Sequence, residues 1–155
     1  TKDAAVIERA KQRLLLAVFL QMTYPGAPTI YYGDEVGVTG GDDPYNRATY
    51  PWEDEGGTPD KALLAEFKKL TQLRHEHAIL RRGKLLAPLH VDEHVIVFAR
   101  EHEGRWALTA VNNAALPKTV TVALPREAAA HFGGARDGRL TLEVPALFGV
   151  VQFSR

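Results

Sequence analysis

Apolar positions recur at helical spacing from residue 3 to about residue 22. The second half of this segment, Leu14–Leu20, is apolar on every side, so other parts of a protein must cover most of its surface. Pro25 and Gly26 then end the pattern. The sequence therefore predicts a helix over residues 3–22 whose later turns are largely enclosed.

A short apolar run, Thr29–Tyr32, follows between Pro28 and Gly33 and is rich in β-branched and aromatic residues. Such a run predicts a buried strand. A helix that leads into a short buried strand is half of a βαβ unit, so we expect this strand to belong to a parallel sheet. One strand is not a sheet, and the other strands must come from elsewhere.

A second helix is predicted from Thr58 to between His77 and Leu80. Thr58 and Pro59 have the residue types that are preferred at an N-cap and at the first helical position. Leucine and phenylalanine then recur at helical spacing, with basic and polar residues on the other face. Gly83 follows a basic pair, as is usual beyond the end of a helix.

From about residue 81 the sequence predicts a series of short β-strands separated by turns. Glu103 and Gly104 predict a hairpin turn, and regularly spaced turn residues separate the later runs. This pattern is typical of an antiparallel β-sandwich. We therefore predict an α/β part over residues 1–80 and an all-β domain over residues 81–155, with strands at 95–100, 106–111, 119–124, 139–144 and 148–153.

The segment between the two predicted helices, residues 33–57, has no period. It contains seven carboxylates and one arginine, together with six glycines and three aromatic residues. A long segment without secondary structure is usually functional or disordered, and disordered segments are poor in aromatic residues. The acidic loop, as we call residues 33–57, is therefore the first candidate for a binding site.

Asp43 and Arg47 are the most suggestive pair in the acidic loop, because they lie four residues apart across Pro44. Carboxylate and guanidinium groups can each bridge adjacent hydroxyls of a sugar with charge-assisted hydrogen bonds. The alternative is an internal ion pair that only fixes the loop. Trp52 also has two possible roles, since its ring could pack against the loop or stack on a ligand.

Composition excludes several classes of function. The chain has 155 residues, 45% of them hydrophobic, no cysteine and a net charge of zero. A nucleic-acid or membrane partner is disfavoured without a basic excess, and no apolar run is long enough to span a bilayer. A calcium site in the acidic loop lacks the usual ligand spacing, and His75 and His77 are too close together for a zinc helix motif. We expect no metal and no cofactor.

No signal peptide is visible in the sequence, and we expect a cytoplasmic location. The chain begins with Thr1 rather than Met, so we expect the parent protein to extend further in the N-terminal direction.

The string Pro25-Gly26-Ala27-Pro28-Thr29-Ile30-Tyr31-Tyr32-Gly33-Asp34-Glu35-Val36-Gly37 closely resembles a segment of the α-amylase family of glycoside hydrolases. The following stretch, through Asp43-Pro44-Tyr45-Asn46-Arg47 to Trp52, is similar to the neopullulanase, cyclomaltodextrinase and maltogenic amylase branch. This branch often has Cys at the position of Asn46 and a basic residue at the position of Ala48.

The resemblance implies that residues 1–80 are the terminal βα portion of a (β/α)8 barrel and that residues 81–155 are its C-terminal β domain. It implies that Asp43 and Arg47 bind a glucosyl unit, and we add Trp52 as a substrate-binding residue. The family's three catalytic carboxylates follow earlier strands, so this segment is expected to contain no catalytic residue. Alone it should be inactive, and the rest of the barrel is its expected partner.

The sequence therefore predicts the C-terminal part of a retaining glycosidase that hydrolyses α-1,4 or α-1,6 glucosidic bonds in maltooligosaccharides, cyclodextrins or related α-glucans. Two alternatives stay open: a non-catalytic carbohydrate-binding β module and a purely structural module. The sequence also leaves open whether the protein forms a homo-oligomer.

Overall fold

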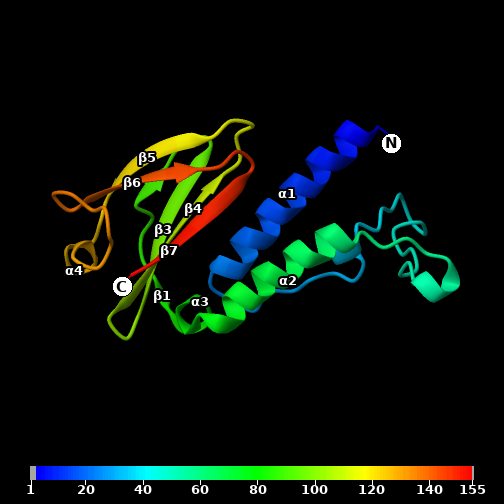
Figure 1. Cartoon of the computed structure of the whole chain (residues 1–155), viewed down its shortest axis with the longest axis horizontal. Coiled ribbons are helices and arrows are strands. Elements are labelled where there is room, and N and C mark those ends of the chain that lie inside the picture. Colours follow the sequence, from blue (N-terminus) through cyan, green and yellow to red (C-terminus); the bar gives the residue numbers. More distant parts are fainter. Residues whose placement is uncertain (1–2, 155) are drawn as a thin grey trace.

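The computed structural model describes residues 3–154, in which two long helices lie beside a β domain (Figure 1). Helix α1 spans Ala4–Thr23, and α2 spans Lys61–Glu76. Two short helices, α3 (Ala78–Arg82) and α4 (Arg126–Ala129), precede and interrupt the strands. The strands are β1 (Lys84–Leu85), β2 (His90–Val91), β3 (Val95–His102), β4 (Arg105–Asn112), β5 (Lys118–Ala123), β6 (Arg139–Val144) and β7 (Phe148–Phe153).

The β domain is built on the hairpin formed by β3 and β4. Its turn has φ of 52° at Glu103 and 74° at Gly104, the left-handed values that a two-residue hairpin turn requires. Strands β1, β3, β4 and β7 lie in that order in an antiparallel sheet, and β2 also pairs with β3. Strands β5 and β6 form a separate antiparallel pair, so the five predicted strands and the hairpin turn are confirmed.

The two sheets enclose the main core, which confirms the predicted sandwich. Alternate residues of each strand point into this space, as the two-residue repeat of a strand dictates. Apolar side chains fill it from β3, β4, β5 and β6, and Phe132 closes one end. The buried members that face one another across the two sheets include Val95, Val97, Ala99, Leu108, Ala110, Val122, Leu140, Leu142 and Val144.

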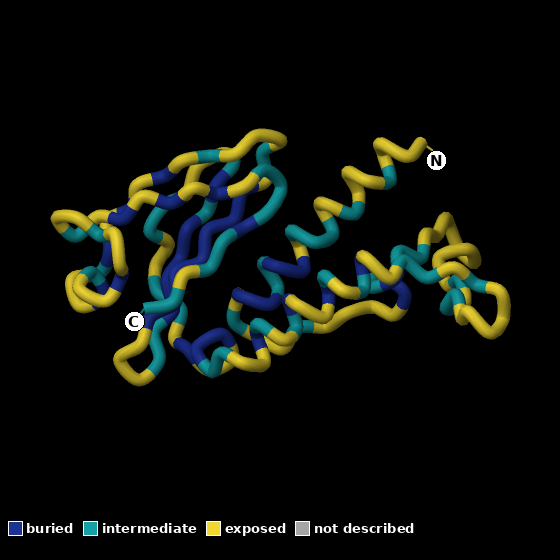
Figure 2. The backbone as a smooth tube through the Cα atoms, viewed as in Figure 1, coloured by how far each residue is buried: buried dark blue, intermediate teal, exposed yellow. Residues whose placement is uncertain are grey.

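The opposite face of the larger sheet packs against the helices. Val18, Phe19 and Met22 of α1 form a second core with Phe67 of α2 and Val111 of β4. Because β4 has a core on both sides, every residue of this strand after Arg105 is buried (Figure 2). The apolar second half of α1 is thereby largely covered, as its sequence requires.

Helices α1 and α2 run side by side in the same direction. The Lys11 ammonium of α1 forms a 2.5 Å ion pair with Asp60, the N-cap of α2. At the other end, Arg74 of α2 donates to the carbonyl oxygen of Met22 at the end of α1, at 2.7 Å. The start of α2 therefore lies beside the middle of α1, and the two C-terminal ends lie together, so the chain between the helices must return along their length (Figure 1).

Two buried arginines fix the ends of these helices. Arg100 of β3 is 1% exposed and donates to the carbonyl oxygens of Thr23, Leu80 and Gly83 at 2.5–3.2 Å. Arg74 donates to three carbonyl oxygens of residues 22–26. Burial, and secondarily the charge of Arg74, lowers the pKa of Arg100 from its ordinary value. The guanidinium fork suits this role because it presents several donors in one plane.

Two predictions about the α/β part are wrong. Thr29–Tyr32 has no regular secondary structure and is exposed, because no neighbouring strand among residues 3–154 offers it hydrogen bonds. The N-cap of α2 is Asp60 rather than Thr58, and its side chain accepts from the Leu63 amide at 2.9 Å.

Within the described residues, no helix is long and apolar enough to cross a membrane.

Candidate functional site

The acidic loop lies at the end of the helix pair that is remote from the β domain (Figure 1). It contains two 3₁₀ turns, Asp34–Val36 and Glu53–Glu55. The first turn begins at Gly33, where φ is 91° and the amide donates to a carboxylate oxygen of Glu35 at 2.8 Å. Burial, and secondarily the charge of Glu35, raises the pKa of Asp34 above its ordinary value. The acidic pair at the start of the loop is therefore part of its local structure.

Asp43 and Arg47 contact each other, which is the internal ion pair named above as the alternative to sugar binding. The Arg47 guanidinium donates to a carboxylate oxygen of Asp43 at 2.9 Å, across a turn closed by the 2.7 Å hydrogen bond from the Tyr45 amide to the Asp42 carbonyl. The peptide bond between Asp43 and Pro44 is cis. Both charged side chains are about two-thirds exposed, at 68% and 67%. An ion pair this exposed adds little stability, so both groups are accessible to a ligand.

Trp52 is also exposed, at 57%, and its ring lies 4.4 Å from that of Tyr50 between centroids. Its backbone carbonyl accepts from Gly57 at 2.8 Å, which fixes the turn on which the ring is carried. Within the part of the chain that the structure describes, Trp52 is thus packed against another aromatic residue of the acidic loop. Its role in binding stays a prediction.

A hollow of about 200 Å³ lies beside the acidic loop and brings in two residues that sequence reasoning missed. Tyr31 and Tyr32 line it together with Asp34 and Asn46, and the Tyr32 hydroxyl donates to the Ala48 carbonyl at 3.0 Å. We had assigned both tyrosines to a buried strand. The two tyrosines directly precede Gly33, where the acidic loop begins. This position alone indicates that at least one of them contacts the loop.

Metal ligation is not supported by this arrangement. In the part of the chain that the structure describes, no three histidine or acidic side chains are grouped so that they could hold a metal ion. The chemistry present at the acidic loop is that of hydrogen-bonding charged groups beside exposed aromatic rings.

No protein-family model matches the chain. Curated relatives do. The chain is 32% identical over 167 residues to an amylopullulanase of Thermoanaerobacterium saccharolyticum, an alignment that covers 94% of this chain and 13% of that protein. It is 46% identical over 99 residues to an amylopullulanase of Thermoanaerobacter thermohydrosulfuricus, covering 64% and 6%. A cyclomaltodextrinase of a Bacillus species is 38% identical over 104 residues, covering 66% and 18%.

Solved structures agree with these relatives. An Anoxybacillus α-amylase matches with a TM-score of 0.79 at 26% identity, over 92% of this chain and 32% of that one. A cyclomaltodextrinase matches with a TM-score of 0.76 at 29% identity, over 94% and 26%. The chain belongs to the α-amylase family of glycoside hydrolases. It spans only 6–18% of the three curated relatives named above, so it corresponds to one part of these α-amylase-family proteins.

Proposed function

We propose that this chain is the C-terminal part of a retaining glycosidase that cleaves α-1,4 or α-1,6 bonds in α-glucans. Residues 1–80 supply the last helices of its (β/α)8 barrel, and residues 81–155 form its C-terminal β domain. The observation that carries the proposal is the accessible Asp43–Arg47 pair, held in an aromatic-rich loop that follows the family's characteristic segment.

The exposed segment Thr29–Tyr32 supports the barrel assignment. It is an apolar run in the connection between two helices that lie side by side in the same direction, the arrangement of consecutive helices in an α/β barrel. Ile30, Tyr31 and Tyr32 are exposed here, although residues of this type are favoured in buried strands. Pairing with barrel strands supplied by the rest of the parent protein would cover them and satisfy their backbone groups.

The acidic loop would then lie at the face of the barrel where the active sites of this fold are formed. Asp43 and Arg47 would exchange their mutual ion pair for hydrogen bonds to the adjacent hydroxyls of one glucosyl unit. Trp52 would offer an apolar ring face to a sugar. Retaining glycosidases need two carboxylates about 5–5.5 Å apart, and we assign these to the rest of the parent protein. No cofactor is required for this chemistry.

The test is steady-state kinetics of the full-length enzyme with Asp43→Ala and Arg47→Ala. Each loses charge-assisted hydrogen bonds worth about 1–3 kcal/mol, so kcat/KM for a cyclodextrin should fall roughly 5- to 150-fold. The matched control is Asp54→Ala, which removes another exposed carboxylate of the same loop and should leave kcat/KM unchanged. Unchanged kinetics with cyclodextrin and maltotriose in both test variants would refute the binding role and favour a purely structural module.

A stand-alone carbohydrate-binding β module is less well supported. Such a module needs an exposed aromatic platform on the sandwich, but Trp106, the tryptophan of the β domain, is buried.

A further inference from the structure

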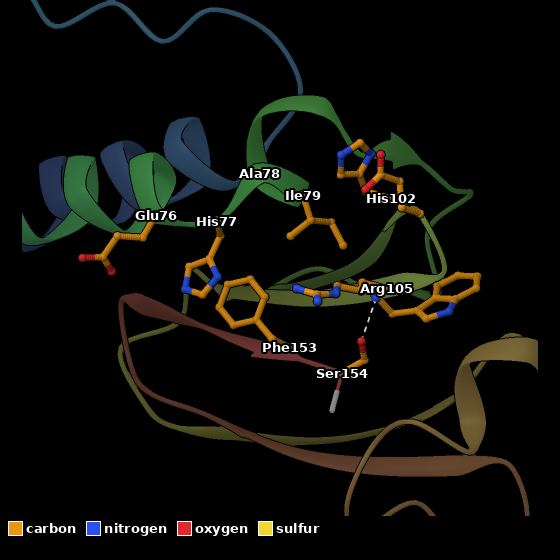
Figure 3. A pocket seen from close by; sticks show the side chains of 10 residues that line it. Glu76, His77, Ala78, Ile79, His102, Arg105, Phe153 and Ser154 are labelled. Carbon is orange, nitrogen blue, oxygen red and sulfur yellow. Dashed lines mark hydrogen bonds between the residues drawn. The ribbon is translucent and has the colours of Figure 1, made fainter.

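A cavity lies at the other end of the helix pair, away from the acidic loop. It has a volume of about 560 Å³, within the range of small-molecule sites. Its walls come from the junction of α2 and α3, the β3–β4 hairpin and the end of β7 (Figure 3). We call it the junction cleft.

Two walls of the junction cleft are rigid. The His77 ring, at the break between α2 and α3, stacks on Phe153 of β7 with centroids 3.8 Å apart and planes at 16° (Figure 3). Across the cleft, the Trp106 amide donates to the Ser154 hydroxyl and the Ser154 amide donates to the Trp106 carbonyl, both at 2.8 Å. A ligand therefore meets preformed walls, which reduces the entropy lost on binding.

Polar side chains that have no partner within residues 3–154 line the same cleft. His102, Glu103 and Arg105 come from the β3–β4 hairpin, and their side chains make no hydrogen bond or ion pair in the described part of the chain. Figure 3 shows Arg105 extending along the cleft toward Phe153 and Ile79. Donors and acceptors thus lie beside an apolar wall.

The charges select the class of ligand. The Glu76 carboxylate accepts from the Gln72 side-chain amide at 2.6 Å and points away from the cleft (Figure 3). Glu103 and Arg105 then form a balanced set of charges in the cleft, which favours neither an anion nor a cation. Carboxylate and guanidinium groups together beside the apolar surface of Phe153 and Ile79 suit a neutral molecule that carries many hydroxyls. We propose that the junction cleft is a second saccharide-binding site, separate from the acidic loop. Its assignment to α-glucans in particular rests on the proposed function.

The test is a titration of the 155-residue chain with maltotriose. Binding is monitored through the NMR chemical shifts of the backbone amides and the tryptophan indoles. Signals of Gly104, Trp106 and Ser154 should shift saturably. Arg105→Gln and Glu103→Asn should each weaken this response at least fivefold; asparagine is used because it tolerates the positive φ at position 103. Phe153→Leu, which keeps apolar volume but removes the ring, should do the same.

The double variant Asp43→Ala/Arg47→Ala is the matched control, and its junction-cleft shifts should persist. Inorganic sulfate should not compete with maltotriose. Shifts confined to the acidic loop, cleft shifts unchanged by Arg105→Gln and Glu103→Asn, or displacement by sulfate would each overturn the proposal. Equal cleft binding of cellotriose, which is β-linked, would keep a saccharide site but refute its specificity for α-glucans. Failure of the proposed function is read separately, from the kinetics of the full-length loop variants.

Discussion

Replacing the buried Arg100 by methionine should destabilise the protein strongly. The substitution keeps a long apolar side chain but removes the donors to the carbonyl oxygens of Thr23, Leu80 and Gly83, all three of which are buried residues. A buried carbonyl that loses its donor costs about 1–3 kcal/mol, so three cost roughly 6 kcal/mol. No carboxylate of residues 3–154 forms an ion pair with Arg100, so removing this buried charge offsets about 2–4 kcal/mol of that loss. The net loss should be about 2–4 kcal/mol.

Urea unfolding followed by far-UV circular dichroism measures this loss. With a slope of about 2 kcal/mol per molar urea, the midpoint should fall by roughly 1–2 M. Arg139→Met is the control, since this arginine is exposed on β6 and should change stability by less than about 0.5 kcal/mol. Arg100→Lys should lose at least half as much as Arg100→Met, because an ammonium lacks the planar fork. A midpoint for Arg100→Met within error of the parent chain would refute this reasoning.

Three further predictions concern single positions. Asp60→Ala should destabilise α2 by about 1 kcal/mol through loss of its cap, whereas Thr58→Ala should be neutral in the same urea assay. The Leu63 amide and then Lys11 lower the pKa of Asp60, so this stability is present above about pH 4 and is lost as pH falls below it. Hydrogen bonds, first from His90, hold the pKa of Asp92 well below its usual range, so Asp92→Ala should lower stability at neutral pH and flatten its decline between about pH 4 and pH 2. Gly149→Ala should lower the melting temperature, since a Cβ there would collide with the Phe19 ring and the Ala110 carbonyl, at a cost of about 1–3 kcal/mol.

The β domain was predictable because its signals are local. Short runs of β-branched and aromatic residues, the alternation over residues 119–124 and a two-residue turn at Glu103 and Gly104 identify the elements without knowledge of their partners. Thr29–Tyr32 failed for the opposite reason: its residue types favour a strand, but a strand exists only where a neighbour offers hydrogen bonds. The two-residue strands β1 and β2 were missed because two residues are too few to show a period.

Long-range contacts decided the rest. Thr58 and Asp60 both have capping side chains, and the additional contact of Asp60 is with Lys11, 49 residues away. No pattern in the sequence distinguishes Arg74 and Arg100 from the exposed arginines of this chain. In the candidate site, the four-residue spacing of Asp43 and Arg47 left an internal ion pair and sugar binding as alternatives. The structure shows the ion pair, because a single turn brings such positions together. The spacing carried no information about Trp52, whose neighbours depend on the whole loop.

The two parallel helices are held firmly at one end and carry the acidic loop at the other. Both are anchored by arginines at their C-terminal ends beside the sheet, while the acidic loop is carried at the opposite, N-terminal end of α2. Sixteen residues of α2 span about 24 Å. By simple geometry over that length, a tilt of about 5° at the anchored end displaces the far end by roughly 2 Å, which exceeds the tolerance of about 0.5 Å for a well-placed binding group. The β domain, though remote from the acidic loop, thereby sets the orientation of Asp43 and Arg47.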